Sequence, residues 1–505
     1  MTVLPIVERE LRVTARRRQT FWIRVALVIG ALAIGGWVML VASRFSTPQS
    51  VGQTVFVALS GLVFFYALLA GLWATADCLS EEKRAGTLGL LFLTDLKGYD
   101  IVLGKLAATS LHALSGLLAV LPVMAIPLLL GSVAGAEVAR VGLVSLNTLF
   151  ISLSAGLFSS AVCRHERAAV GLAFGLLATL TVGLPLLGAL IADRLGQREP
   201  HLAFLLLSPG FTCILAFQAQ IGAMSAAQAD FVASVALVHG LGWLFLVSAC
   251  LLAPRTWQER TAGARPARWR RWWRDLVQGS PERRRRFRAR LLAENAFYWL
   301  AARDRSRPAM LWLFLFVSAL LWGWGWAAYP HDWLDEPTFV FTGLVVNTIL
   351  KCWLASEAAW RFSHDRQSGA LELVLATPLR VTEIVRGQLA ALLRQFGVPV
   401  LVVVVVEILF LGAGRGDEWV VVWVAGVGML LADLVTLSWV GMWLGLNSRH
   451  HSRAMAAALA LVCVLPWVLF GLFATLHGLT RFMRTSSLDE NHFTLIWLGL
   501  GLIVD

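Results

Sequence analysis

Long apolar runs are the feature that most limits what this chain can fold into. Runs of about 20 apolar residues, the length a helix needs to cross the hydrocarbon core of a membrane, recur along the sequence. Lipid leaves only helices and closed barrels stable, and the alternating pattern of a barrel is absent. We therefore expect an all-α, polytopic membrane protein of about 11–12 transmembrane helices. The predicted spans are residues 21–43, 51–76, 106–131, 138–162, 168–192, 231–253, 309–328, 338–360, 389–413, 419–446 and 454–477, followed by a run at 493–505 that is too short to cross.

Composition and charge agree with this class and predict an orientation. The chain is 58% hydrophobic and 15% charged, more apolar and less charged than ordinary soluble domains. Five arginines precede the first span, so the positive-inside rule places the N-terminus in the cytoplasm. Alternating spans then put these loops on the cytoplasmic side: 77–105, 163–167, 254–308, 361–388 and 447–453.

Most of the net charge of +12 lies in one stretch, where 16 arginines between Arg255 and Arg307 accompany five acids. Tryptophans lie among these arginines, a pattern that suits contacts to phosphates and stacked bases. In a chain with many spans the same pattern also suits anionic headgroups and the depth of the membrane interface. We favour the second interpretation, and expect the lipid bilayer and no nucleic acid as partner of this linker.

An internal repeat relates two distant loops. Aligning Gly86 with Gly369 lays "EKRAGTLGLLFLTDLKGYDIVLGKLAA" on "DRQSGALELVLATPLRVTEIVRGQLAA". We interpret the chain as two similar six-helix bundles of the same orientation, a parallel duplication. The identical pairs include glycines, a leucine and a threonine: Gly86 with Gly369, Leu88 with Leu371, Thr94 with Thr377 and Gly104 with Gly387.

The repeat suggests a division into three parts. Residues 1–253 would form a first half with about six spans, and residues 254–293 a basic interfacial or cytoplasmic linker. Residues 294–505 would form a second half with five to six spans, the last of them cut short.

Each copy of the repeat predicts the same local structure. Gly86 and Gly369 should end a charged helix that extends from the preceding span. A short amphipathic helix of about ten residues should follow, and a Thr-Asp or Thr-Pro pair should break it. Asp100 and Glu383 should begin the next helix, because helix N-termini favour negative charge.

These two segments resemble the cytoplasmic coupling segment of ABC-transporter permeases of the type-2 exporter family. That family's pattern has a Gly-Thr/Ala-Leu-Glu core, "LLxTP", and an "IVxGK" start to the next span. "VERELRVTARRR" is similar to its in-plane N-terminal helix, and residues 193–230 resemble its external re-entrant hairpin. The first copy departs from the pattern, with Gly89 where the second has Glu372 and Asp95 where it has Pro378.

The resemblance implies the permease subunit of an ATP-driven exporter in a bacterial-type plasma (inner) membrane, without catalytic residues. Its coupling helices would dock on cytoplasmic P-loop ATPase subunits, and its two halves would form the translocation path. No G-x-x-x-x-G-K-[ST] motif occurs, so a partner would bind the ATP, and we expect no cofactor or metal in this chain. The positions expected to couple to the ATPase are Glu82, Arg84, Gly86, Leu88, Leu90, Thr94, Asp95, Gly104, Asp365, Arg366, Gly369, Leu371, Glu372, Leu373, Thr377, Pro378 and Gly387.

Three ionisable residues, Lys351, Glu407 and Asp433, fall inside predicted spans. A charge near the bilayer centre costs about 2.5–3.5 kcal/mol, so these side chains should face the interior of the bundle. Lys351 and Asp433 lie at similar depth, and we expect a structural ion pair between them. The functional alternative is a proton relay or a polar substrate path.

Two other functions remain open on these residues. A membrane-embedded enzyme acting on a lipid-linked substrate would need an acid pair or a nucleophile with its base, and "YPHDWLDEP" at 329–337 is the acid cluster outside the repeat. An ion-coupled secondary transporter would use the charges inside the spans. The sequence does not indicate the transported substrate.

Overall fold

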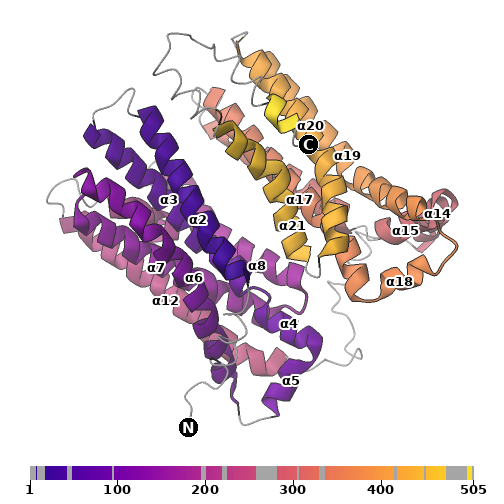
Figure 1. Cartoon of the computed structure of the whole chain (residues 1–505), viewed down its shortest axis with the longest axis horizontal. Coiled ribbons are helices and arrows are strands. Elements are labelled where there is room, and N and C mark those ends of the chain that lie inside the picture. Colours follow the sequence, from indigo (N-terminus) through magenta and orange to yellow (C-terminus); the bar gives the residue numbers. More distant parts are fainter. Residues whose placement is uncertain are drawn as a thin grey trace. The chain divides into compact units, whose positions relative to one another are not determined.

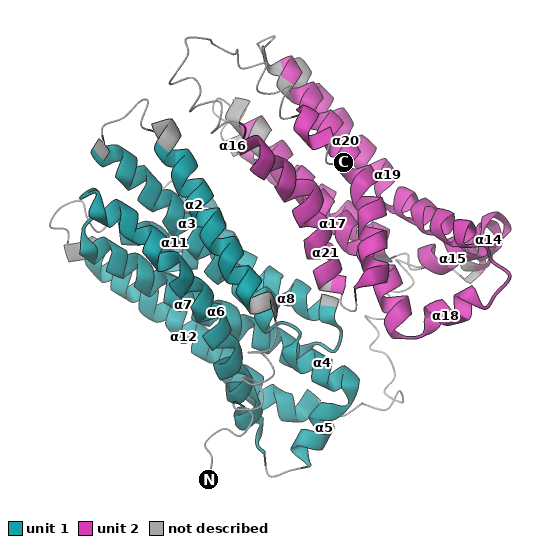
Figure 2. Cartoon of the chain, in the orientation of Figure 1, with its two compact units in different colours: residues 1–263 teal, residues 264–505 magenta. Residues whose placement is uncertain are grey.

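The computed structural model is all-α: every regular element in the residues that it describes is a helix. The expected fold class, an all-α polytopic membrane protein, is therefore confirmed. The chain divides into two compact units, residues 1–263 and 264–505 (Figure 2). The described residues are 18–42, 48–93, 96–194, 201–218, 225–256, 281–303, 306–328, 336–413, 418–448, 451–471 and 498–502, with Val7 and Phe473.

The first unit is a bundle of long helices built around α7 (Gly135–Val162) (Figure 1). Its other helices are α2 (Arg18–Ala42), α3 (Pro48–Ala74), α4 (Cys78–Ala85), α5 (Thr87–Phe92), α6 (Gly98–Leu129), α8 (Glu166–Ala178), α9 (Leu184–Arg194), α10 (Leu202–Leu206), α11 (Pro209–Gln218) and α12 (Ser225–Thr256). A π-helical turn, η1 (Thr179–Gly183), joins α8 to α9. α7 contacts α3, α6, α8, α11 and α12, so it forms the core of the unit.

Small residues let α3 and α7 approach closely. The backbone N–H of Gly71 donates to Ser152 Oγ at 2.8 Å, and Thr75 Oγ1 donates to the Leu153 carbonyl at 2.9 Å. A Cβ atom at Gly156 would lie 2.1 Å from Thr75 Oγ1, so no larger residue fits there without movement. Glycine, serine and threonine are the residues that let membrane helices pack backbone to backbone.

The second unit is built around the pair α17 (Glu336–Gln367) and α20 (Glu418–Asn447) (Figure 1). Its other helices are α14 (Pro281–Glu294), α15 (Ala296–Ala302), α16 (Ser306–Ala328), α18 (Ala370–Leu375), α19 (Val381–Ala413) and α21 (His451–Leu459). α21 continues into a second π-helical turn, η2 (Ala460–Val464). A Cβ atom at Gly445 would lie 2.5 Å from the Ala359 carbonyl oxygen, so glycine again sets a close helix approach.

Within the described residues, 10 helices are long and apolar enough to cross a membrane, and they cover 10 of the predicted spans. The predicted span 338–360 is helical too, as part of α17. α17 has 32 residues, about 48 Å of helix, but it is too polar to count as a span by composition. Its polar residues contact neighbouring helices, as described for the site.

Other predicted segments fall partly or wholly outside the described residues. The loop 193–230 contains two short helices, α10 and α11, and α11 packs against α7 and α12. The linker is described at the end of α12 and in α14, and its residues 257–280 lie outside the description. The loop 329–335 and most of the run 493–505 also lie outside it.

Candidate functional site

The two repeat segments turn at glycines with the same backbone conformation. Gly86 has φ 73° and Gly369 has φ 71°, the left-handed region that side chains with a Cβ rarely adopt. The N–H of Gly86 donates to the Lys83 carbonyl, and the N–H of Gly369 donates to the Arg366 carbonyl, each at 3.3 Å. Both glycines end the helix before them, as predicted.

A short helix follows each glycine, but it is shorter than predicted. α5 and α18 have six residues each, instead of about ten, and they occupy the same positions in the alignment of the repeat. The N–H of Leu93 donates to the Gly89 and Leu90 carbonyls, and Thr377 caps the Val374 carbonyl with both its N–H and its hydroxyl. These local bonds satisfy the last carbonyls, so each helix stops before the predicted Thr-Asp or Thr-Pro break.

The next helix begins in the same way in both copies. The Lys97 N–H donates to Asp100 Oδ2 at 2.9 Å, and the Arg380 N–H donates to Glu383 Oε2 at 2.8 Å. Each acid lies in the first turn of its helix, where it also meets the positive end of the helix dipole. The predicted role of Asp100 and Glu383 as helix starters is confirmed.

A basic side chain ties each segment to the end of another helix. Lys83 Nζ donates to the carbonyls of Ser160, at 3.3 Å, and Ala161, near the end of α7. Arg366 Nη1 donates to the Leu446 carbonyl, near the end of α20. A cation at a helix C-terminus satisfies carbonyls that have no partner in the helix and meets the negative end of its dipole.

One leucine seats the first short helix, and others project from it. Leu88 is 1% exposed and packs in a cluster with residues of α4, α6, α7 and α12. Leu90 and Leu93 are 64% and 79% exposed. In the second copy, Leu371 is half-buried, and Leu373 and Leu375 are exposed. Each short helix therefore presents an apolar edge outside its bundle, the kind of feature that marks a binding surface.

The comparison with known families agrees with this geometry. A model of the ABC-2 family transporter protein matches residues 4–253, which include the first short helix and all of its neighbours in the bundle. The chain belongs to the ABC-2 transporter family. It is thus a transmembrane permease of an ABC transporter. None of the curated proteins matches it.

The two repeat segments of this ABC-2 permease differ in an ion pair that joins two helices. Lys105 of α6 pairs with Glu82 of α4 at 3.2 Å, which joins two helices. The alignment of the repeat places Gln388 at the position of Lys105 and Asp365 at that of Glu82. Asp365 instead pairs with Arg361, one turn away on its own helix, at 2.8 Å.

The remaining predicted coupling residues take different places. Arg84 pairs with Asp77 at 2.7 Å, and Glu372, Thr377 and Pro378 are exposed. Thr94 and Asp95 lie outside the described residues. Gly104 and Gly387 are buried in α6 and α19. At Gly387 a Cβ atom would lie 2.8 Å from the Tyr298 backbone nitrogen, so this glycine admits the close approach of α15.

Lys351 and Asp433 form the predicted ion pair, from α17 to α20. Asp433 is buried, and the side chain of Lys351 is 20% exposed. A buried charge without a partner is strongly unfavourable, so each of these residues requires the other. The structural interpretation of the pair is therefore sufficient to explain both charges.

Glu407 joins the same polar cluster through a residue that the sequence analysis missed. Asn347 Nδ2 donates to Glu407 Oε1 at 2.8 Å. Asn347 lies four residues before Lys351 on α17, so the two share one helix face. The four-residue spacing of Asn347 and Lys351 could have predicted this polar cluster, which joins α17, α19 and α20.

The first unit has a neutral network where the second has charges. Asn147 Nδ2 donates to the Val235 carbonyl at 3.0 Å, and its Oδ1 lies 3.1 Å from His239 Nδ1. Trp243 Nε1 donates to His239 Nε2 at 3.0 Å, which assigns the ring proton to Nδ1 and makes His239 the donor to Asn147. The spacing of His239 and Trp243, four residues apart on α12, was the missed signal.

Proposed function

We propose that this chain is the permease subunit of an ATP-driven exporter and that a separate cytoplasmic P-loop ATPase docks on α5 and α18. The observation that carries the proposal is the twin geometry: a left-handed glycine, a six-residue helix with exposed leucines, and an acid-capped membrane helix, repeated in both units. One chain would then supply both halves of the translocation path.

The contacts around α5 support a mechanical role. Leu88 is buried in a cluster with residues of α4, α6, α7 and α12, and this cluster anchors α5 on the bundle. Lys83 bonds carbonyls near the end of α7, and the Glu82–Lys105 pair joins α4 to α6. Closure of the ATPase would push α5, and these contacts would pass the movement into the spans.

The proposal also sets the orientation. The short helices would face the cytoplasm, where ATP is available, and the N-terminus would lie on the same side of a plasma (inner) membrane. The arginines before α2 favour this side by the positive-inside rule.

The test is purification of the full chain from its native membrane, with measurement of the ATPase that accompanies it. We expect a P-loop ATPase to co-purify with the unchanged chain. The amount of co-purified ATPase should fall by about tenfold when Leu90 and Leu93 are both changed to serine. Each truncation removes an exposed apolar contact and leaves the buried Leu88 in place.

The matched control is Leu129→Ser, at the other end of α6 and 85% exposed. This variant should retain the ATPase. Co-purification of an equal amount of ATPase with the Leu90→Ser/Leu93→Ser double variant would refute docking on α5.

A further inference from the structure

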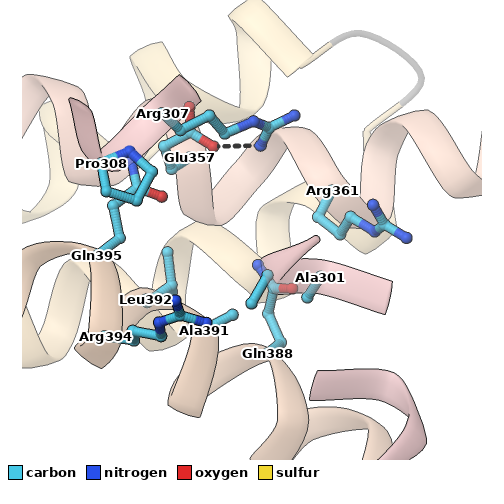
Figure 3. A pocket seen from close by; sticks show the side chains of 11 residues that line it. Ala301, Arg307, Pro308, Glu357, Arg361, Gln388, Ala391, Leu392, Arg394 and Gln395 are labelled. Atoms are coloured by element: carbon cyan, nitrogen blue, oxygen red, sulfur yellow. Dashed lines mark hydrogen bonds and ion pairs between the residues drawn. The ribbon is translucent and has the colours of Figure 1, made fainter. Parts of the chain in front are cut away.

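A cavity of about 320 Å³ lies in the second unit, where α15, the start of α16, α17 and α19 meet (Figure 3). Six of its lining residues are polar: Arg307, Glu357, Arg361, Gln388, Arg394 and Gln395. None of the proposed coupling contacts involves it, and its chemistry differs from that of the bundle core.

The cavity wall carries an excess of positive charge. Three arginines and one glutamate line it. Arg307 donates to Glu357 at 2.6 Å, the contact drawn as a dashed line in Figure 3, and Arg361 pairs with Asp365 at 2.8 Å. The Arg394 guanidinium lies over the Phe287 ring at 4.2 Å, and no ion pair to Arg394 occurs among the described residues. The wall therefore favours an anion.

Two amides in the same wall are buried, and one polar atom of each has no hydrogen-bond partner among the described residues. Gln388 is 4% exposed and Gln395 is 8% exposed. Gln388 Oε1 and Gln395 Nε2 have no hydrogen-bond partner among the described residues. Buried polar atoms are nearly always satisfied, so an acceptor and a donor left open beside one cavity indicate a ligand that offers both.

The position of the cavity indicates a ligand at the membrane surface. Arg307 and Pro308 stand where the apolar span Arg307–Trp326 begins. Exposed apolar side chains continue from there along both walls, Met310 and Leu313 on α16 and Leu393 on α19. A molecule with an anionic head and an apolar tail matches this order, because basic pockets between membrane helices suit lipid headgroups.

We propose that this cavity binds the phosphate group of an anionic glycerophospholipid. Arg394 and the Gln395 amide would donate to the phosphate oxygens, since guanidinium groups match phosphate in geometry and charge. Gln388 Oε1 would accept from a hydroxyl of the headgroup. The acyl chains would lie against the exposed residues of α16 and α19.

The first unit offers a comparison within the same chain. The alignment of the repeat, continued along α6 and α19, places Lys105 at the position of Gln388, His112 at that of Gln395 and Leu111 at that of Arg394. Lys105 is used in the ion pair with Glu82 at 3.2 Å. The residues that define the phosphate site are thus particular to the second unit.

The test uses the full chain in phosphatidylcholine vesicles, with and without phosphatidylglycerol. Retention of phosphatidylglycerol is measured by native mass spectrometry, and the midpoint of thermal unfolding by intrinsic fluorescence. We expect the unchanged chain to retain phosphatidylglycerol and to unfold at a higher temperature when it is present. Gln388→Leu/Gln395→Leu and Arg394→Gln should each bind this lipid at least about tenfold more weakly.

The glutamine variant separates binding from stability. Leucine has a similar size and leaves no polar atom unsatisfied, so the double variant should be at least as stable as the unchanged chain in phosphatidylcholine alone. Arg386→Gln removes a charge from the same helix outside the cavity, and should leave lipid retention unchanged. If the double variant fails to fold, Arg394→Gln alone tests the proposal. Arg394 is exposed, so this substitution leaves the buried wall of the cavity intact.

A second arm distinguishes the source of the phosphate. Inorganic phosphate added to phosphatidylcholine vesicles should not raise the unfolding midpoint; a rise that the variants abolish would support a phosphate site but overturn the lipid as its occupant. Equal retention of phosphatidylglycerol by the unchanged chain, the double variant and Arg394→Gln would overturn the proposal.

Discussion

Gly86 and Gly369 hold backbone angles that alanine adopts only at a cost. A Cβ at either glycine would meet no atom within 4 Å, so the cost comes from the backbone alone. Gly131 has the same conformation, with φ 68° and open space around it, but lies in the turn after α6, at the opposite end of α6 from α5. The chain thus contains its own control for strain.

We predict that Gly86→Ala, Gly369→Ala and Gly131→Ala each lower the free energy of unfolding by about 1 kcal/mol. Only the first two should also reduce the stimulation of the ATPase by the permease, because only they distort the start of a coupling helix. Unfolding by denaturant and ATP hydrolysis in the reconstituted complex measure the two effects. If Gly131→Ala also reduced the stimulation of the ATPase, backbone strain outside the two segments would be enough to reduce it, and the prediction would be wrong.

Residue patterns predicted some contacts of the site and missed others. The Lys351–Asp433 pair could be foreseen because two opposite charges at equal depth have few other ways to be satisfied. The network of Asn147, His239 and Trp243 could not, because neutral side chains find partners of many kinds, including backbone carbonyls. Periodicity gives the face of a helix, but not which neighbouring helix that face meets.

At the scale of elements, the glycines and acids of the repeat correctly predicted where the helices before and after each short helix end and begin. The lengths of α5 and α18 were overestimated: each helix ends after six residues, where the N–H of Leu93 and the N–H and hydroxyl of Thr377 bond carbonyls of the last turn. The lipid-facing spans were predictable from their apolar runs, whereas α17 combines the length of a span with a polar composition. The cavity at α15 was not predictable, because it depends on how four helices meet.

The ion pairs of the two repeat segments join different elements. The Glu82–Lys105 pair joins α4 to α6, whereas the Arg361–Asp365 pair lies within α17. A push on α5 should therefore reach α6 through a charged contact that the second copy does not have.

We predict that Lys105→Gln, which introduces the residue found in the second copy, lowers the free energy of unfolding by about 2 kcal/mol, because it leaves Glu82 without its cation. It should also reduce ATPase stimulation more than its effect on stability explains. Lys97→Gln is the control, since Lys97 is exposed and bonds Asp100 through its backbone N–H. Equal stimulation by both variants would contradict a role for the Glu82–Lys105 pair in transmission.

At the scale of the whole molecule, one chain with two coupling segments should bind two ATPase subunits. If each permease chain instead bound one ATPase subunit, a complex with two ATPase subunits would contain two permease chains. The number of ATPase subunits per chain is therefore a direct measure of the proposed fusion of two halves.

We predict a native mass of one permease chain with two ATPase subunits. The Leu373→Ser/Leu375→Ser variant should lose the subunit held by α18 and retain the one held by α5, because each pair of leucines is exposed on its own helix. Native mass spectrometry of the complex in detergent distinguishes these masses. A complex with two permease chains would be incompatible with the fusion.

The π-helical turns η1 and η2 have a consequence for insertions and deletions in this chain. In each turn an N–H bonds the carbonyl five residues earlier, Leu184 to Thr179 and Leu465 to Ala460, so the turn holds one residue more than an α-helical turn. Removing one residue there would convert the π-turn into an α-helical turn, and the residues beyond it would keep their faces. Removing one residue elsewhere in α8 or α9 would instead rotate everything beyond it by about 100°. The two turns are thus the positions at which these spans could lose a residue and keep the same side chains toward the lipid.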